Sequence, residues 1–155
     1  MHRKFSALTM AIALCVAAAA FRVTARAETT PEDAKDYRIS VMSSMGGHIG
    51  AISKHVRGLV EDHGFLAKHA EALANGAAEL QYLFPSGSGV GDSEALPAIW
   101  DEPEEVAKAI AEAEQATAAF SKAASAGDED AIDAAFREVG AACRGCHDRF
   151  RKDDD

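Results

Sequence analysis

The sequence predicts an all-α fold, an antiparallel four-helix bundle. Hydrophobic residues make up 48% of the 155 residues but aromatic residues only 6%, and much of the apolar content is alanine. Alanine is the best helix former, whereas strands favour β-branched and aromatic residues. Four segments repeat apolar residues at steps of three and four, and none shows the two-residue period of a strand. Four helices with one apolar face each pack most simply as a bundle.

The first 27 residues have the layout of a secretory signal peptide. A basic start precedes an apolar run from Phe5 to Phe21, and Ala25-Arg26-Ala27 has the small residues of a cleavage site. The alternative is an uncleaved membrane anchor, but the run is marginal in length for a spanning helix. We expect cleavage after Ala27. Residues 28–155 would then form one domain in a Gram-negative periplasm, with no remaining membrane segment.

The expected mature chain is strongly acidic. Removing residues 1–27 takes away four of the 16 basic residues and none of the 25 acidic ones, so the net charge falls from −9 to −13. A nucleic-acid binder needs a basic face, which argues against that class of function. An acidic protein is instead attracted to basic partners.

The first helix is expected to begin at Thr30-Pro31, because threonine caps helices and proline suits their first turn. Three glycines, Gly46, Gly47 and Gly50, lie inside its pattern despite their low helix propensity. We expect something bulky to approach the backbone there. The apolar stripe of this helix consists of Arg38, Met42, Met45, Ile49, Ile52 and Val56.

A second helix is expected from about Asp62 to Leu83. A glycine-rich loop follows from Pro85 to about Trp100. Such a connection is long for a bundle and indicates a functional or crossover segment. The stripe of the second helix consists of Leu66, His69, Leu73, Gly76, Leu80 and Leu83.

The third helix is expected to begin near Asp101, with Pro103 in its first turn, and the fourth at the cap Asp128. The third stripe consists of Val106, Ile110, Ala113, Thr117 and Phe120. The fourth consists of Ile132, Phe136, Val139, Cys143, Cys146 and Phe150.

The sharpest motif is Cys143-Arg144-Gly145-Cys146-His147, a C-x-x-C-H pattern typical of covalent haem attachment. On a helix, Cys143 and Cys146 lie one turn apart on one face, so both sulfurs can reach the two vinyl groups of one porphyrin. The imidazole of His147 follows directly and can serve as the proximal iron ligand. The motif therefore predicts one covalent haem c, with its iron, near the C-terminal end of the bundle.

Three other uses of the cysteine pair are weaker. A disulfide is common in exported proteins, but it leaves His147 unexplained and fits poorly within a helix. A zinc site needs two further ligands, and none is evident. A thioredoxin-like pair needs a βαβ context, which is absent from the pattern. A haem would also supply the apolar volume that the alanine-rich stripes lack, so folding is expected to depend on it.

With these residues in place, the sequence resembles the cytochrome c′ family from about Pro31 to Lys152. The matching segments are PEDAKDYR at 31–38, the glycine-rich loop leading to Ile99-Trp100, and VGAACRGCHDRFRK at 139–152. The resemblance implies a four-helix bundle in which His147 is the proximal ligand and Arg38 lies beside a haem propionate. It also implies that Arg151 lies close to the proximal imidazole. Ile39 stands where the family often has glutamine.

The resemblance places Met42 on the distal side of the iron. In low-spin members a methionine there is the sixth ligand, which suits electron transfer with redox partner proteins. This is the leading interpretation, with Met42 bound to iron. The alternative is a five-coordinate protein that binds nitric oxide or carbon monoxide at an open site, with Met42 as packing. Neither function is that of an enzyme, because no acid–base pair is evident.

Two further expectations concern the oligomer and the other histidines. The resemblance implies a homodimer through the first two helices, which the polar faces neither support nor exclude. His69, on the second stripe, is expected to be a partly buried histidine with its hydrogen bonds satisfied. His48, His55 and His63 are expected in solvent or at helix edges.

Overall fold

The computed structural model describes residues 28–153, and within them the chain forms four long helices and two short ones. The expected signal peptide and its cleavage site lie outside the described residues. The elements are α1 (Pro31–Val56), α2 (Leu66–Glu79), the 3-10 turn η2 (Leu80–Tyr82), α3 (Ala98–Asp101), α4 (Pro103–Ala126) and α5 (Glu129–Phe150). No helix in this part of the chain is long and apolar enough to cross a membrane.

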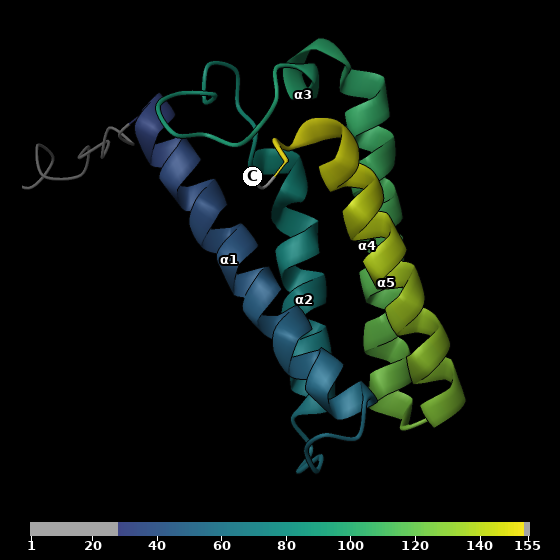
Figure 1. Cartoon of the computed structure of the whole chain (residues 1–155). Coiled ribbons are helices and arrows are strands. Elements are labelled where there is room, and N and C mark those ends of the chain that lie inside the picture. Colours follow the sequence, from purple (N-terminus) through teal and green to yellow (C-terminus); the bar gives the residue numbers. More distant parts are fainter. Residues whose placement is uncertain (1–27, 154–155) are drawn as a thin grey trace, which may run out of the picture.

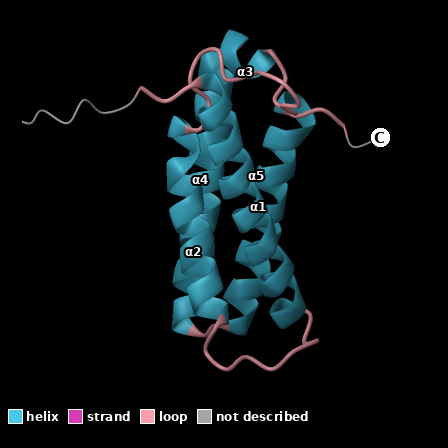
Figure 2. Cartoon of the chain, turned by 90° about the vertical axis from the view of Figure 1, so that its left-hand side faces the viewer, coloured by secondary structure: helices cyan, strands magenta, loops and turns pink. Residues whose placement is uncertain are grey.

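The four long helices run alternately up and down, which confirms the antiparallel bundle (Figure 1). α2 packs on α1 and on α4, and α4 packs on α5. Figure 2 shows their axes nearly parallel, with the α1–α2 loop at one end and the α2–α4 crossover at the other. Toward the crossover end α1 leans away from α5 (Figure 1).

The helix ends follow from local chemistry. The hydroxyl of Thr30 accepts the Asp33 N–H at 3.1 Å, and the carboxylate of Asp128 accepts the Ala131 N–H at 3.1 Å, as the two predicted caps require. Gly127 ends α4 with a φ of +70°, a conformation that glycine adopts without strain.

The second helix begins at Leu66, four residues later than the sequence predicts. One Asp62 carboxylate oxygen accepts the N–H groups of Gly64, Phe65 and Leu66 at 2.9–3.0 Å. Gly64 has a φ of +84°, so the chain turns before it can become helical. At the other end, α2 tightens into η2 over Leu80–Tyr82. The short helix α3, within the expected loop, was also not predicted.

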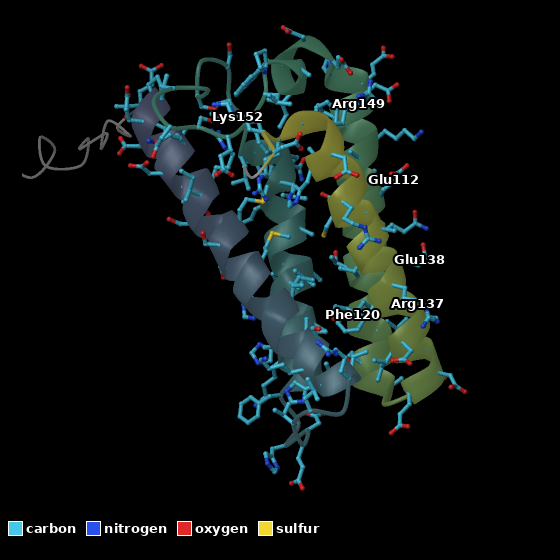
Figure 3. The ribbon with its side chains drawn as sticks, in the orientation of Figure 1. Glu112, Phe120, Arg137, Glu138, Arg149 and Lys152 are labelled. Carbon is cyan, nitrogen blue, oxygen red and sulfur yellow. The ribbon has the colours of Figure 1, made fainter. Side chains whose placement is uncertain are left out.

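The main hydrophobic cluster runs from Phe120 and Ile132, at the end away from the crossover, to Leu80 and Leu83, where the crossover begins. The rings of Phe120 and Phe136 lie 5.5 Å apart, and Phe120 lies between the helices in the lower half of Figure 3. The side chains that are completely buried confirm the predicted stripes, and they include Ile52, Leu73, Phe120 and Val139.

The expectation about Gly46, Gly47 and Gly50 was wrong within this chain. A Cβ built on any of the three meets no atom within 4 Å, so nothing bulky approaches them from the rest of the molecule. The close approach occurs at Gly76 instead, where a Cβ would lie 2.8 Å from Cγ of Met45. The missing side chain of Gly76 lets α1 and α2 pack closely at that level.

The crossover, residues 83–97, is hydrogen bonded to three elements: α1, α3 and the segment that follows α5. The Nε1–H of Trp100 donates to the Phe84 carbonyl at 3.1 Å. After α5, Ala95 and Arg151 form an antiparallel bridge, and the Lys152 ammonium donates to the Ser93 carbonyl at 2.7 Å. Figure 3 labels Lys152 at this end of the bundle. The long loop is thus a fixed cover over the ends of α1 and α5.

We predict that replacing Gly89 with alanine lowers the free energy of unfolding by roughly 1–3 kcal/mol. The new Cβ would lie 2.8 Å and 2.9 Å from two indole carbons of Trp100, which is held by its own hydrogen bond. Chemical unfolding of the haem-loaded protein measures the effect. In the control, Gly46→Ala, the methyl group meets nothing, so stability should rise by about 0.5–1 kcal/mol. An unchanged Gly89→Ala stability would contradict the proposed contact.

Candidate functional site

An apolar cavity at the crossover end collects the predicted site residues. α5 contributes Cys143, Cys146 and His147, and α1 contributes Met42 and Met45. The remaining wall comes from η2, the crossover, α3 and α4, and comprises Leu80, Phe84, Ile99, Val106, Ala109, Ile110, Ala113 and Thr117. Met42 and His147, predicted as the two axial positions, therefore line one cavity from different helices.

The two thiols face this cavity because their spacing in α5 is one turn. Both side chains are half-buried and free, so the alternative of a disulfide between them is not realised. Burial raises the pKa of both Cys143 and Cys146 and keeps the thiols protonated at neutral pH. Phe150, buried beside Ile99, anchors the end of α5 just beyond them.

The cavity wall is otherwise short of polar groups. Thr117 donates its hydroxyl hydrogen within its own helix, to the carbonyl oxygens of Ala113 at 2.8 Å and Glu114 at 3.1 Å, so no donor is left for the cavity. Apart from the two thiols and His147, none of the side chains that line the cavity is ionisable.

Arg38 lies at the edge of this cavity with its guanidinium buried. Its side chain is 5% exposed, and it lies 5.2 Å over the ring of Phe84, which lines the cavity. Two nitrogens donate to the carbonyl oxygens of Leu83 and Ser88 and to the hydroxyls of Ser88 and Ser93, at 2.9–3.0 Å. The sequence predicted Arg38 on the inward stripe of the first helix, which its burial confirms, but not these bonds to the crossover.

All four of those acceptors are neutral. Within residues 28–153, no carboxylate forms an ion pair with Arg38, and burial alone lowers its pKa. A buried cation is stabilised by a carboxylate. Two half-buried thiols, an adjacent imidazole and this guanidinium therefore fit a covalent haem whose propionate lies near Arg38.

Arg151 is close to His147 through the backbone, since its N–H donates to the His147 carbonyl at 3.0 Å. Its side chain pairs with Glu94 on the crossover at 3.0 Å. The guanidinium thus helps to hold the crossover against the end of α5. The neighbouring Arg149 bonds Glu102 and Glu105 at the start of α4 in the same region (Figure 3).

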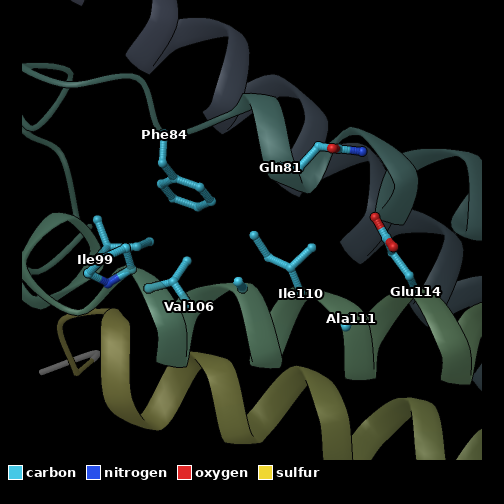
Figure 4. A pocket seen from close by; sticks show the side chains of 9 residues that line it. Gln81, Phe84, Ile99, Val106, Ile110, Ala111 and Glu114 are labelled. Carbon is cyan, nitrogen blue, oxygen red and sulfur yellow. The ribbon is translucent and has the colours of Figure 1, made fainter.

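A second, more open pocket lies on the outer side of the wall (Figure 4). It shares Phe84, Ile99, Val106 and Ile110 with the inner cavity, so these four side chains form a common partition. The outer pocket has no thiol or imidazole in its lining. The haem-binding groups therefore belong to the inner cavity.

Comparison with known proteins decides the family. The family model for Cytochrome C' matches residues 33–151. The chain belongs to the cytochrome c′ family. Members carry a covalent haem c with iron and serve in electron transfer or gas binding, and the fold and the cofactor predicted from the sequence are both confirmed.

Individual cytochromes c′ match nearly the whole described chain. The cytochrome c′ of Pararhodospirillum photometricum is 33% identical over 124 residues, which cover 79% of this chain and 99% of the relative. A solved ferrous variant of Alcaligenes xylosoxidans cytochrome c′ with bound NO has a TM-score of 0.75 and 32% identity, covering 82% of this chain and 99% of that one. A carbon-monoxide-bound variant has a TM-score of 0.74 and 34% identity, covering 80% and 98%.

We predict that Arg38→Met lowers the free energy of unfolding of the haem-loaded protein by roughly 2–4 kcal/mol. Loss of the Arg38 guanidinium leaves the buried oxygen atoms of the crossover without their hydrogen-bond donor. Lys35→Met is the control, because Lys35 also reaches the crossover from α1, through an ion pair with exposed Asp92 at 2.7 Å. Exposed pairs contribute little, so its effect should be clearly smaller. Equal losses in the two variants would contradict a special role for Arg38.

Proposed function

We propose that this cytochrome c′ binds a small diatomic gas, nitric oxide or carbon monoxide, on the Met42 side of its haem, and that it is not an enzyme. The observation that carries the proposal is the cavity wall. It offers the thiols of Cys143 and Cys146 and the imidazole of His147 on α5, and almost entirely apolar side chains elsewhere. An apolar, crowded space favours small neutral ligands over charged or polar substrates. The NO and CO complexes of the solved relatives support the same function.

Each residue has a separate task in this proposal. Cys143 and Cys146 hold one edge of the ring, and His147 supplies the proximal imidazole. The haem, when bound, supplies an iron that takes up a gas on its open side. Met42 and Met45 limit the space there, while Arg38 fixes the polar edge of the ring against the crossover.

The second candidate function is the electron carrier predicted first from the sequence. It is favoured by the place of Met42, whose thioether lines the same cavity as His147. A methionine–histidine iron suits electron transfer. In that case the strongly acidic chain would dock basic redox partner proteins. The comparisons support gas binding more strongly, because several of the matched solved structures hold NO or CO.

The remaining expectations belong to the same proposal. Export through the signal peptide at 1–27 would place the protein in the periplasm, where haem c proteins work with gases or redox partners. A homodimer through α1 and α2 would cover Gly46, Gly47 and Gly50, which are exposed on α1. A second copy would then be the bulky neighbour that those glycines suggested.

We predict that the purified holoprotein has a high-spin iron that binds CO, and that Met42→Ala binds CO more tightly, by roughly tenfold, because crowding is relieved. Optical and EPR spectra of both oxidation states, with and without gas, measure this.

Met42→Leu separates size from ligation, because leucine keeps the volume of methionine but has no sulfur. In the gas-binding protein, Met42→Leu should leave the spin state unchanged. A low-spin parent that becomes high-spin in Met42→Leu would overturn the open site and establish the electron carrier.

A further inference from the structure

Three histidines from two helices meet at the α1–α2 interface, away from the haem cavity. Nδ1 of His48 lies 2.9 Å from Nδ1 of His69, and their ring centroids are 5.2 Å apart. The ring of His55 lies on the other side of His69, with 6.5 Å between centroids. We call these three residues the histidine cluster. All three residues are half-buried, which agrees with the helix-edge positions expected for His48 and His55 and with the partly buried position expected for His69.

The helical repeat explains the cluster. His48 and His55 are seven residues apart, so they lie on one face of α1 two turns apart. His69 faces them from the antiparallel helix α2. His48 is three residues beyond Met45, the nearest cavity residue of α1, about 4.5 Å along the helix, and none of the three histidines lines the haem cavity.

One nitrogen of the cluster has no partner among the described residues. In the His48–His69 contact one ring donates and the other accepts, so that pair is satisfied. Nδ1 of His55 is buried and has no hydrogen-bond partner among the described residues. Buried ring nitrogens are normally satisfied, and a neutral imidazole nitrogen is the commonest metal donor in proteins.

The first two nitrogens, which hydrogen bond to each other here, are also close enough to share one ion. Two atoms 2.9 Å apart subtend about 90° at an ion that lies roughly 2.0–2.1 Å from each. A tetrahedral zinc ion would need them about 3.3 Å apart. Right-angled nitrogen donors are typical of square-planar or tetragonal Cu²⁺, which also binds such donors most tightly among the divalent first-row ions.

We propose that the histidine cluster binds one Cu²⁺ ion, with His48 and His69 as the primary ligands and His55 as the third. No three His, Cys, Asp or Glu side chains in residues 28–153 already surround one point, so His55 must turn its ring toward the pair. The donating ring of the pair moves its proton to Nε2, so no proton has to leave. Asp62, whose charge acts on His55, adds a negative charge nearby.

The test is a titration of the purified, oxidised holoprotein with Cu²⁺, followed by calorimetry and by EPR, with the spectrum of the copper-free protein subtracted. One equivalent should bind, with nitrogen hyperfine structure from imidazole. His48→Gln and His69→Gln should each weaken binding by about 10–100-fold, and His55→Gln by a smaller factor. Zn²⁺ should bind more weakly than Cu²⁺.

The matched control is His63→Gln. His63 lies on the α1–α2 loop with its side chain 75% exposed, so its removal should not change the affinity. Circular dichroism and the haem spectrum check that each variant is folded and that the gas site is intact. Unchanged affinity in the His48→Gln, His69→Gln double variant, or no bound equivalent at all, would overturn the copper site. Neither result would bear on gas binding, which is read from the haem spectrum.

Discussion

The buried guanidinium of Arg38 is the contact on which the site end of the molecule depends. A long crossover has no helical hydrogen-bond ladder of its own, so its carbonyl groups need donors from elsewhere. From the first turns of α1, Arg38 donates to two of these carbonyl oxygens and to two serine hydroxyls of the crossover. Arginine can do this because its donors form a rigid planar fork, whereas lysine concentrates its charge at one point. The crossover, once fixed, positions Phe84 and α3 as walls of the cavity.

The two ends of the bundle solve the packing problem differently. At one end, phenylalanine and branched aliphatic side chains such as Phe120, Ile52 and Val139 interlock without a ligand. At the other, α1 leans away from α5, and the groups that face the space are two thiols, an imidazole and methionines. Cysteine, histidine and methionine are the side chains that bind iron and porphyrin, so this end is built to be completed by the cofactor. The cofactor and the crossover therefore share the task of closing the bundle.

Periodicity and capping signals were enough to predict the four helices, the caps Thr30 and Asp128, and the helix that presents Cys143, Cys146 and His147. They failed where tertiary or turn chemistry decides the outcome. The three hydrogen bonds that Asp62 accepts delay the start of α2 to Leu66. The partners of Arg38 lie 45–55 residues away in the chain. The histidine cluster was missed because its members belong to two helices. The spacing of His48 and His55 was a usable signal, but only packing shows that His69 faces them.

α1 carries both the distal wall of the haem cavity and two members of the histidine cluster on neighbouring turns of one helix. Met45 lies between Met42 and His48, and it fits closely against α2 only because Gly76 has no side chain. One turn of close helix packing thus separates the two sites. Packed interiors transmit displacement poorly across soft contacts and well across tight ones. The contact of Met45 with Gly76 therefore fixes the position of α1 for both sites, and an ion held between His48 and His69 would act on the same interface that sets the space beside Met42.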